Sequence, residues 1–380
     1  MPVGTRVHRL NKRISRRCFL ASGGTAAAIL AGGGKVRAAP RAPSPVYSAY
    51  HEQMVSGSTP DTVQYQWVRA GVDACLKAMT GQASAGDAWE SLFAGIGTQS
   101  KVAIKVNCLN TDVHPQFATV RALVESMTEM LGGTFPAGNI SLFDNNLWTT
   151  GKVDACYGGA RLDALGIVHG EDSYPATTTV MVGGTSMYVS RFWAEADYAV
   201  SLAKMAPHQY YAGGLSGVIK NMMGAVSLAN DNYQAKRDNS GFHDGAPYTA
   251  FRDLFANWGG AHLQLYIVDM LFACRHENAA GWERVVKRIT MGRDPVAVDS
   301  YNVDKINELG MNVVQPVTKA VPQALEQAGL GSVAYDLVEP EVALPQVPSR
   351  DDIDALLRAR MQGQATDGQV REQIGKYREQ

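Results

Sequence analysis

Short β-branched runs alternate with segments of helical periodicity along the chain, and this alternation constrains the fold more than any other feature. The clearest runs are 101–107, 139–144, 198–202 and 263–271. Strands that alternate with helices predict a mostly parallel sheet with helices on both faces. We therefore predict an α/β fold, with a hairpin inserted at 180–189 and helices near 216–228, 318–329 and 350–377.

Composition divides the chain of 380 residues into four parts. Residues 1–38 are predicted to be a signal peptide, and residues 39–61, rich in Pro, Ser and Gly, a linker. Residues 62–335 are predicted to form a single α/β domain, followed by a C-terminal helical extension at 336–380. A chain with 46% hydrophobic residues is long enough to bury a sizeable core, which excludes a disordered or disulfide-stapled peptide.

The N-terminal segment has its features in the order typical of a twin-arginine export signal. Residues 15–20 read S-R-R-C-F-L, a short apolar stretch rich in Ala and Gly follows at 21–34, and small residues near Ala38 suit signal peptidase. Eight of the 35 Lys and Arg residues lie in residues 1–38, which contain no Asp or Glu. The alternative interpretation is an Arg-rich tail before a short core helix. The signal predicts a periplasmic protein that the twin-arginine translocase carries in its folded state.

Charge and cysteine spacing exclude several function classes for the remaining chain. Its acidic balance argues against nucleic-acid binding, which depends on neutralising phosphates, and no later segment is apolar for long enough to span a membrane. Cys75, Cys108, Cys156 and Cys274 lack C-x-x-C spacing, which argues against self-contained iron–sulfur, thioredoxin-like and c-type haem sites. Buried thiols or one structural disulfide are the alternatives.

Polar residues follow the predicted strands at the point where each strand ends. In open α/β sheets, ligands bind beyond these carboxyl ends. A lysine among apolar residues is costly to bury without a partner, and this applies to Lys105 and Lys220. One interpretation pairs both lysines structurally with Asp144, Asp269 or Asp299. The other is a cationic site for a carboxylate or phosphate, in which Asn side chains add hydrogen bonds.

The second interpretation assigns roles to particular residues. We predict catalytic roles for Lys105, His208 and Lys220, and substrate binding by Asn107, Lys204, Asn221 and His243. A divalent metal held by Asp269 and Asp299 is a further hypothesis, although no ligand spacing of the H-E-x-x-H kind is present.

The same residues carry a resemblance to a known family. The motifs are Ile104–Asn107, Lys204–His208, Lys220–Gly224, Ile267–Asp269 and Asp294–Asp299. In this order they resemble the I-K-P-N, P-K-L-K-T-H, K-N-x-x-G, I-V-D and D-P-V-A-x-D elements of the domain-of-unknown-function family numbered three hundred and sixty-two, over about residues 95–310. Val106 replaces the usual proline, and Ala206 stands where a second lysine is typical. The resemblance implies the architecture and the location of a site, without naming a reaction.

Two functions are therefore predicted as alternatives. The first is a periplasmic enzyme that acts on a small anionic molecule at the carboxyl edge of the sheet, with or without a metal. The second is a non-catalytic accessory protein that binds a metal, a cofactor or an exported redox-enzyme partner. Export in the folded state is compatible with both, because proteins on this pathway often carry a cofactor or travel with a partner.

Overall fold

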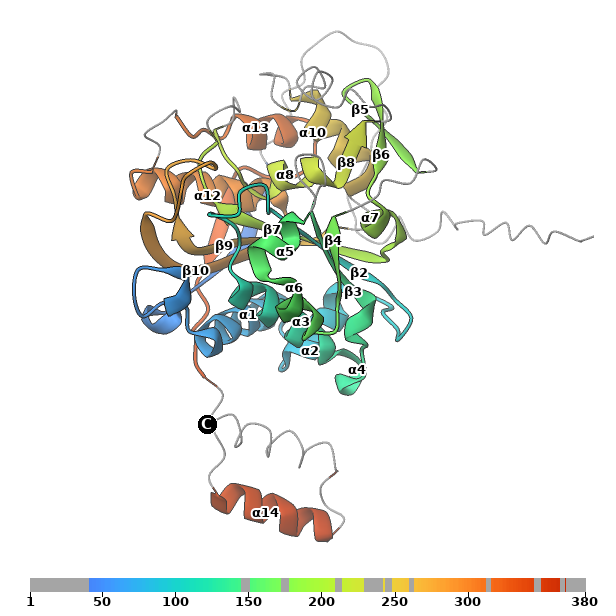
Figure 1. Ribbon diagram of the computed structural model, residues 1–380, viewed down its shortest axis with the longest axis vertical. Coiled ribbons are helices and arrows are strands. Elements are labelled where there is room, and N and C mark those ends of the chain that lie inside the picture. Colours follow the sequence, from blue (N-terminus) through green and yellow to red (C-terminus); the bar gives the residue numbers. More distant parts are fainter. Residues whose placement is uncertain are drawn as a thin grey trace, which may run out of the picture. The chain divides into compact units, whose positions relative to one another are not determined.

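Figure 1 shows the computed structural model of the chain. It describes residues 41–144, 151–171, 178–208, 214–228, 242, 248–259, 263–311, 316–344, 350–362 and 366. The strands are β1 (Ser44–Tyr50), β2 (Val102–Val106), β3 (Ile140–Asp144), β4 (Val168–Glu171), β5 (Thr179–Val182), β6 (Thr185–Val189), β7 (Tyr198–Met205), β8 (Val226–Leu228), β9 (Leu263–Ala273), β10 (Arg284–Gly292) and β11 (Tyr335–Val338). The α-helices are α1 (Tyr65–Thr80), α2 (Ala85–Leu92), α3 (Phe117–Thr128), α4 (Met130–Gly133), α5 (Lys152–Tyr157), α6 (Gly159–Asp163), α7 (Arg191–Glu195), α8 (Val218–Asn221), α10 (Thr249–Leu254), α12 (Pro295–Glu308), α13 (Ala320–Gln327) and α14 (Arg350–Met361).

The main sheet has eight strands in the order β11-β1-β10-β9-β7-β2-β3-β4. Within the described chain, neighbouring strands run parallel except where β10 meets β9 and β1. The mostly parallel α/β sheet predicted from the alternation of strands and helices is therefore confirmed. Parallel strands buried on both faces are near-continuous apolar runs, which explains why β2, β7 and β9 were visible in the sequence.

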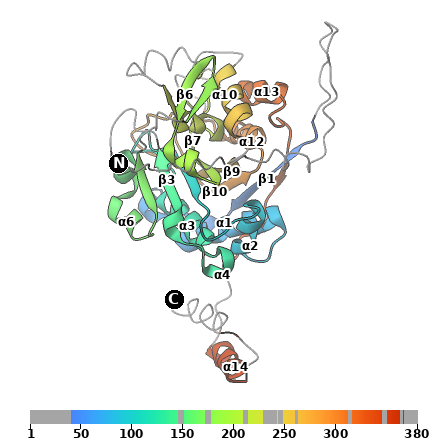
Figure 2. The ribbon, with the colours of Figure 1, turned by 90° about the vertical axis from the view of Figure 1, so that its right-hand side faces the viewer.

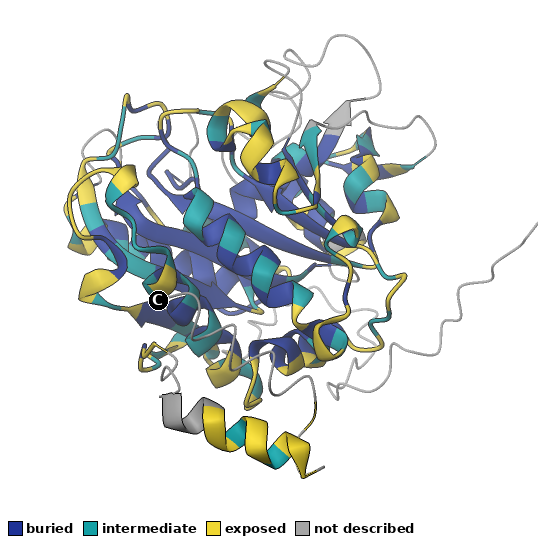
Figure 3. Ribbon diagram, turned by 60° about the horizontal axis from the view of Figure 1, so that its bottom comes forward, coloured by how far each residue is buried: buried dark blue, intermediate teal, exposed yellow. Residues whose placement is uncertain are grey.

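Helices cover both faces of this sheet, and each face has its own hydrophobic core (Figures 1 and 2). Along β2, Val102, Ile104 and Val106 pack with α1, α2 and α3, whereas Ala103 faces the core that contains α8, α10, α12 and α13. Because side chains alternate along a strand, Lys105 lies on the same face as Ala103. Figure 3 shows the buried sheet between the partly exposed helices.

The predicted hairpin is present as β5 and β6, and β8 adds a third antiparallel strand to it. The helix predicted near 216–228 is wrong in length. Helix α8 ends at Asn221, a 3₁₀ turn follows at Met222–Ala225, and the chain then enters β8. A Gly at position 224 and the β-branched Val226 favour this break over a continued helix.

Two segments differ from the predicted linker and C-terminal extension. The stretch 39–61 contains β1, which pairs with both β10 and β11. Pro45 made this stretch look like a linker. The pairing of β1 with β10 begins only at Tyr47, so the missing N–H of Pro45 costs no hydrogen bond to β10. Strand β11 extends past residue 335 to Val338 within the main sheet. The proposed domain boundaries themselves stay predictions.

Candidate functional site

A hollow at the carboxyl ends of β2, β3 and β7 brings together side chains that lie far apart in the sequence. Its volume is about 550 Å³, counting the part open to solvent. Six of the predicted site residues line it: Lys105, Asn107, Lys204, His208, Lys220 and Asn221. The lysines come from β2, β7 and α8, so they approach the hollow from separate elements.

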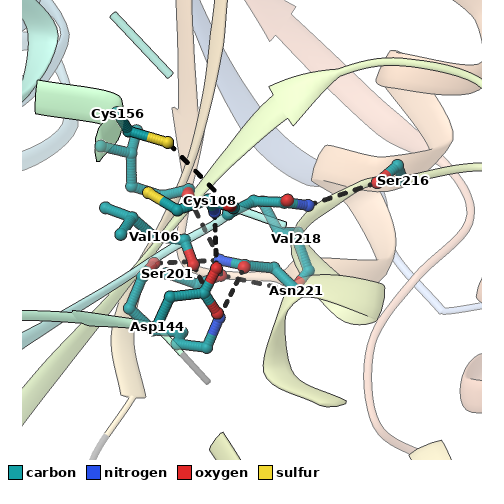
Figure 4. Close-up of polar contacts among 11 residues, drawn as sticks. Val106, Cys108, Asp144, Cys156, Ser201, Ser216, Val218 and Asn221 are labelled. Atoms are coloured by element: carbon teal, nitrogen blue, oxygen red, sulfur yellow. Dashed lines mark hydrogen bonds and ion pairs between the residues drawn. The ribbon is translucent and has the colours of Figure 1, made fainter. Parts of the chain in front are cut away.

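Lys105 is neutralised by a carboxylate in the wall of the hollow. Its Nζ lies 2.6 Å from Asp144 Oδ1 and donates to the carbonyl oxygen of Val106 at 2.6 Å and to Asn221 Oδ1 at 3.1 Å. Asp144 Oδ2 accepts from the Cys108 N–H at 2.5 Å. Figure 4 shows these contacts around Asp144 and Asn221. Both charges have several partners, as buried ions require, so the structural pairing considered from the sequence applies to Lys105.

Asn221 ties α8 to the ends of β2 and β7. Its Nδ2 lies within hydrogen-bond distance of the Lys105 carbonyl oxygen at 2.9 Å, Ser201 Oγ at 3.0 Å and the Leu202 carbonyl oxygen at 3.2 Å. The amide is therefore occupied on both its oxygen and its nitrogen. This arrangement makes Asn221 a positioning residue for the wall rather than a group with spare donors for a ligand.

Lys204 is buried among main-chain acceptors. Its Nζ donates to the carbonyl oxygens of Val113 at 2.7 Å and Glu277 at 3.3 Å. Burial lowers the pKa of Lys204 below the usual value, while the negative charge of Glu277 acts in the opposite direction. Lys204 thus differs from Lys105, whose Nζ contacts a carboxylate.

His208 and Lys220 lie at the same hollow with different surroundings. His208 Nδ1 is 3.8 Å from Glu277 Oε1, a distance that suits an ion pair with protonated His208 but is too long for a hydrogen bond. Lys220 Nζ lies 3.7 Å from Met223 Sδ, a weak acceptor. Lys220 keeps 7% of its surface exposed, against 2% for Lys105 and 1% for Lys204.

Asn107 and Ser216 lie side by side in the lining of the hollow. Asn107 is half-buried, and its Nδ2 donates to Ser216 Oγ at 3.3 Å (Figure 4). The side-chain oxygen of Asn107 and the hydroxyl group of Ser216 can still form hydrogen bonds with a ligand.

Asp269 and Asp299 are engaged by helix N-termini. Asp269 Oδ2 accepts from Gln116 N and Thr119 Oγ1 at the beginning of α3, each at 2.7 Å. Asp299 accepts from Val218 N at 2.9 Å and Ile219 N at 3.0 Å at the beginning of α8. These bonds stabilise the first turn of each helix, as N-terminal carboxylates do.

The positions of Asp269 and Asp299 do not support the metal hypothesis. Neither Asp269 nor Asp299 lines the hollow. Across the residues that the structure describes, no group of three or more His, Cys, Asp or Glu side chains is placed to hold a metal ion. His243 lies outside the described residues.

Glu277 and Ser216 also line the hollow but were not among the predicted site residues. Glu277 follows β9 in a loop, and its only sequence signal was its place after a strand end. Ser216 precedes α8 in a Gly-rich loop whose path the sequence does not fix.

The comparison with protein families agrees with the motif order. A family model described as "Domain of unknown function (DUF362)" matches residues 102–304. The chain belongs to this family. The matched DUF362 segment contains every strand and helix that supplies the lysines of the hollow.

Solved structures give a more distant likeness. The lactate racemase apoprotein from Thermoanaerobacterium thermosaccharolyticum aligns with 11% sequence identity and a TM-score of 0.41, over 70% of this DUF362 chain and 57% of that one. A likeness at this level says nothing of what the present chain binds. No curated protein matches the sequence. In the described part of the chain, every helix is too short or too polar to cross a bilayer.

Proposed function

We propose that the hollow binds a small anionic molecule and that the protein is an enzyme acting on it. The observation that carries this proposal is that Lys220 lines one hollow together with His208, Asn107 and Ser216. A cationic group, a histidine and hydrogen-bonding side chains that meet in one concave site favour a small anionic ligand.

The contacts suggest a separate role for each group of residues. Lys105, Asp144 and Asn221 form the wall and hold α8 in place. Lys220 attracts the anion, and Asn107 with Ser216 orients it at the rim. His208, with Glu277 beside it, moves a proton to or from the bound molecule.

We also propose that the protein acts in the periplasm after export by the twin-arginine pathway. The support is the motif at residues 15–20, with the basic excess before it and small residues near Ala38 after it.

Calorimetric titration with oxalate and with inorganic phosphate tests the anion site. We expect the wild-type protein to bind at least one of the two, and Lys220→Met to weaken that binding by about tenfold or more, since a charge-assisted hydrogen bond is lost. Methionine keeps most of the apolar stem of Lys220, so packing changes little.

The matched control is Lys101→Met, directly before β2, because Lys101 is exposed and pairs with Glu195 away from the hollow. This variant should bind like the wild type. Equal affinity in Lys220→Met and wild type, or no binding of either anion by the wild type, would contradict the proposed function.

A further inference from the structure

Lys204 has the surroundings of a reactive amine rather than of a structural cation. Only 1% of its surface is exposed, yet it lines the hollow. Within the described chain it makes no ion pair, and its polar contacts are the two carbonyl oxygens of Val113 and Glu277. Burial disfavours the charged form of this amine more than the nearby negative charge of Glu277 favours it.

The hydrogen bonds of Lys204 match the neutral form in number. A neutral amine has two N–H donors and one lone pair, and the two carbonyl oxygens accept from two donors. In the neutral form the lone pair is then left over. Burial lowers the pKa of this amine, which is consistent with the same form. Desolvated lysines of this kind act as nucleophiles toward carbonyl compounds.

The neighbours of Lys204 supply the other groups that such chemistry needs. His208 and Glu277 line the same hollow and lie 3.8 Å apart, so a proton can be held near the reacting oxygen. Lys220 lines it as well, from α8, where it can attract a carboxylate. A ligand that used both lysines would carry a carbonyl carbon and a carboxylate within one small molecule.

We propose that Lys204 forms a reversible imine with a small aldehyde or ketone that carries a carboxylate, such as a 2-oxo acid. This proposal rests on the proposed function, because the carboxylate occupies the anion site. The lone pair of Nζ attacks the carbonyl carbon, a C–N bond forms, and the carbonyl oxygen takes up a proton. His208 protonates this hydroxyl group again and it leaves as water, while Nζ loses its protons to give the imine. One amine and one carbonyl compound are converted into one imine and one water.

Reductive trapping on the wild-type protein tests the imine directly. The full chain is incubated with glyoxylate and cyanoborohydride at pH 7, which converts an imine into N-carboxymethyl-lysine, and peptide mass spectrometry then locates the product. We expect Lys204 to be labelled about tenfold or more above any exposed lysine, because an ordinary lysine is less than about 0.1% neutral at this pH. Lys101 and Lys77, which are exposed, serve as internal references.

Oxalate separates this proposal from the anion site, because it carries carboxylates but no reactive carbonyl. We expect excess oxalate to suppress the labelling of Lys204 and to leave the reference lysines unchanged. Oxalate binding by calorimetry without labelling of Lys204 would overturn the imine and leave the proposed function standing. No binding of oxalate or of phosphate, together with no labelling of Lys204, would overturn both. Labelling that oxalate does not suppress would also overturn the proposal, since the amine would then react outside the anion site.

Discussion

Each buried lysine of the hollow is accommodated by a different kind of partner. Lys105 has a carboxylate at 2.6 Å, whereas Lys204 has two main-chain carbonyl oxygens. Removing one partner of a buried ion pair typically lowers stability by about 3–5 kcal/mol, because the remaining charge is left uncompensated. An amine among carbonyls can instead lose its proton. The same residue type therefore serves as scaffold at position 105 and as a candidate nucleophile at position 204.

The Lys105–Asp144 pair depends on the absence of a side chain at Gly224. A Cβ added there would lie 2.8 Å from Lys105 Nζ and 3.1 Å from Asp144 Oδ1. We expect Gly224→Ala to lower the free energy of unfolding by about 1–3 kcal/mol, because overpacking displaces the ion pair. Urea denaturation measures the change.

Gly97→Ala is the matched control, since nothing lies within 4 Å of a Cβ added at Gly97. Its stability should stay within about 0.5 kcal/mol of wild type or rise slightly, through the lower entropy of the unfolded chain. If both substitutions changed the free energy of unfolding equally, the contact between position 224 and the ion pair would not affect stability.

Residue types were predictable from the sequence, whereas their pairing was not. The buried setting of Lys105 was evident from the apolar residues around it, but three carboxylates were equally eligible as its partner. Only the register of β2 beside β3 brings Asp144 to it. Asn221 was expected to bind substrate, but its amide is used up within the protein. Hydrogen bonds of this kind depend on the fold of distant segments, which local patterns do not contain.

Helix α8 is too short to be stable by its own propensity and depends on a distant carboxylate. It spans Val218–Asn221, and isolated helices need roughly 12–15 residues to form in water. Asp299 from α12 binds its first N–H groups, and a Cβ at Gly217 would collide with that carboxylate at 2.1 Å. Asp299 is therefore a positioning residue for Lys220 and Asn221.

The burial of Asp299 predicts a pH dependence of stability. Desolvation raises the pKa of Asp299 from 3.8 to about 7. Between these pH values the folded state binds the proton and the unfolded state does not, so the free energy of unfolding falls as the pH rises through this window. One such group contributes up to about 1.4 kcal/mol per pH unit.

Asp299→Asn removes this titration. We expect its free energy of unfolding, measured by urea denaturation from pH 4 to 7, to fall less steeply than that of the wild type, although it starts lower at pH 4 because one acceptor is lost. Asp61→Asn, at an exposed carboxylate, controls for the loss of one negative charge. Parallel slopes for wild type and Asp299→Asn would contradict the assigned role.

At the scale of elements, sequence patterns located the central strands and missed the edges. The apolar runs of β2, β3, β7 and β9 were found because burial on both faces makes a strand continuous in hydrophobicity. Strand β1 contains Ser and Pro and looked like a linker. The start of α12 at Asp294 and Pro295 is a feature that a sequence can reveal, because N-capping and the fixed φ of proline are local effects.

The whole molecule places its reactive groups at one edge of the sheet and separates two cores on its faces. Three of the five motifs of the DUF362 family, at residues 104–107, 204–208 and 220–224, meet at the carboxyl ends of neighbouring strands, whereas Asp269 and Asp299 of the other two do not line the hollow. This convergence follows from the parallel part of the sheet, formed by β9, β7, β2, β3 and β4, in which crossovers return the chain to the same end. The location of the site was therefore predictable from the fold class, although its chemistry was not.

The N-terminal segment leads to a prediction about the fate of the whole protein. The translocase recognises the paired arginines themselves, so replacing Arg16 and Arg17 by lysine keeps the charge but removes the recognised groups. We expect this double variant to remain in the cytoplasm at full length, while the wild type reaches the periplasm cleaved after Ala38 or Ala39. Cell fractionation and the mass of the N-terminal peptide measure both.

Arg9→Lys is the control, because it also keeps the net charge but lies outside the motif. This variant should be exported like the wild type. Equal export of the double variant and the wild type would refute the signal and, with it, the periplasmic setting of the proposed enzyme.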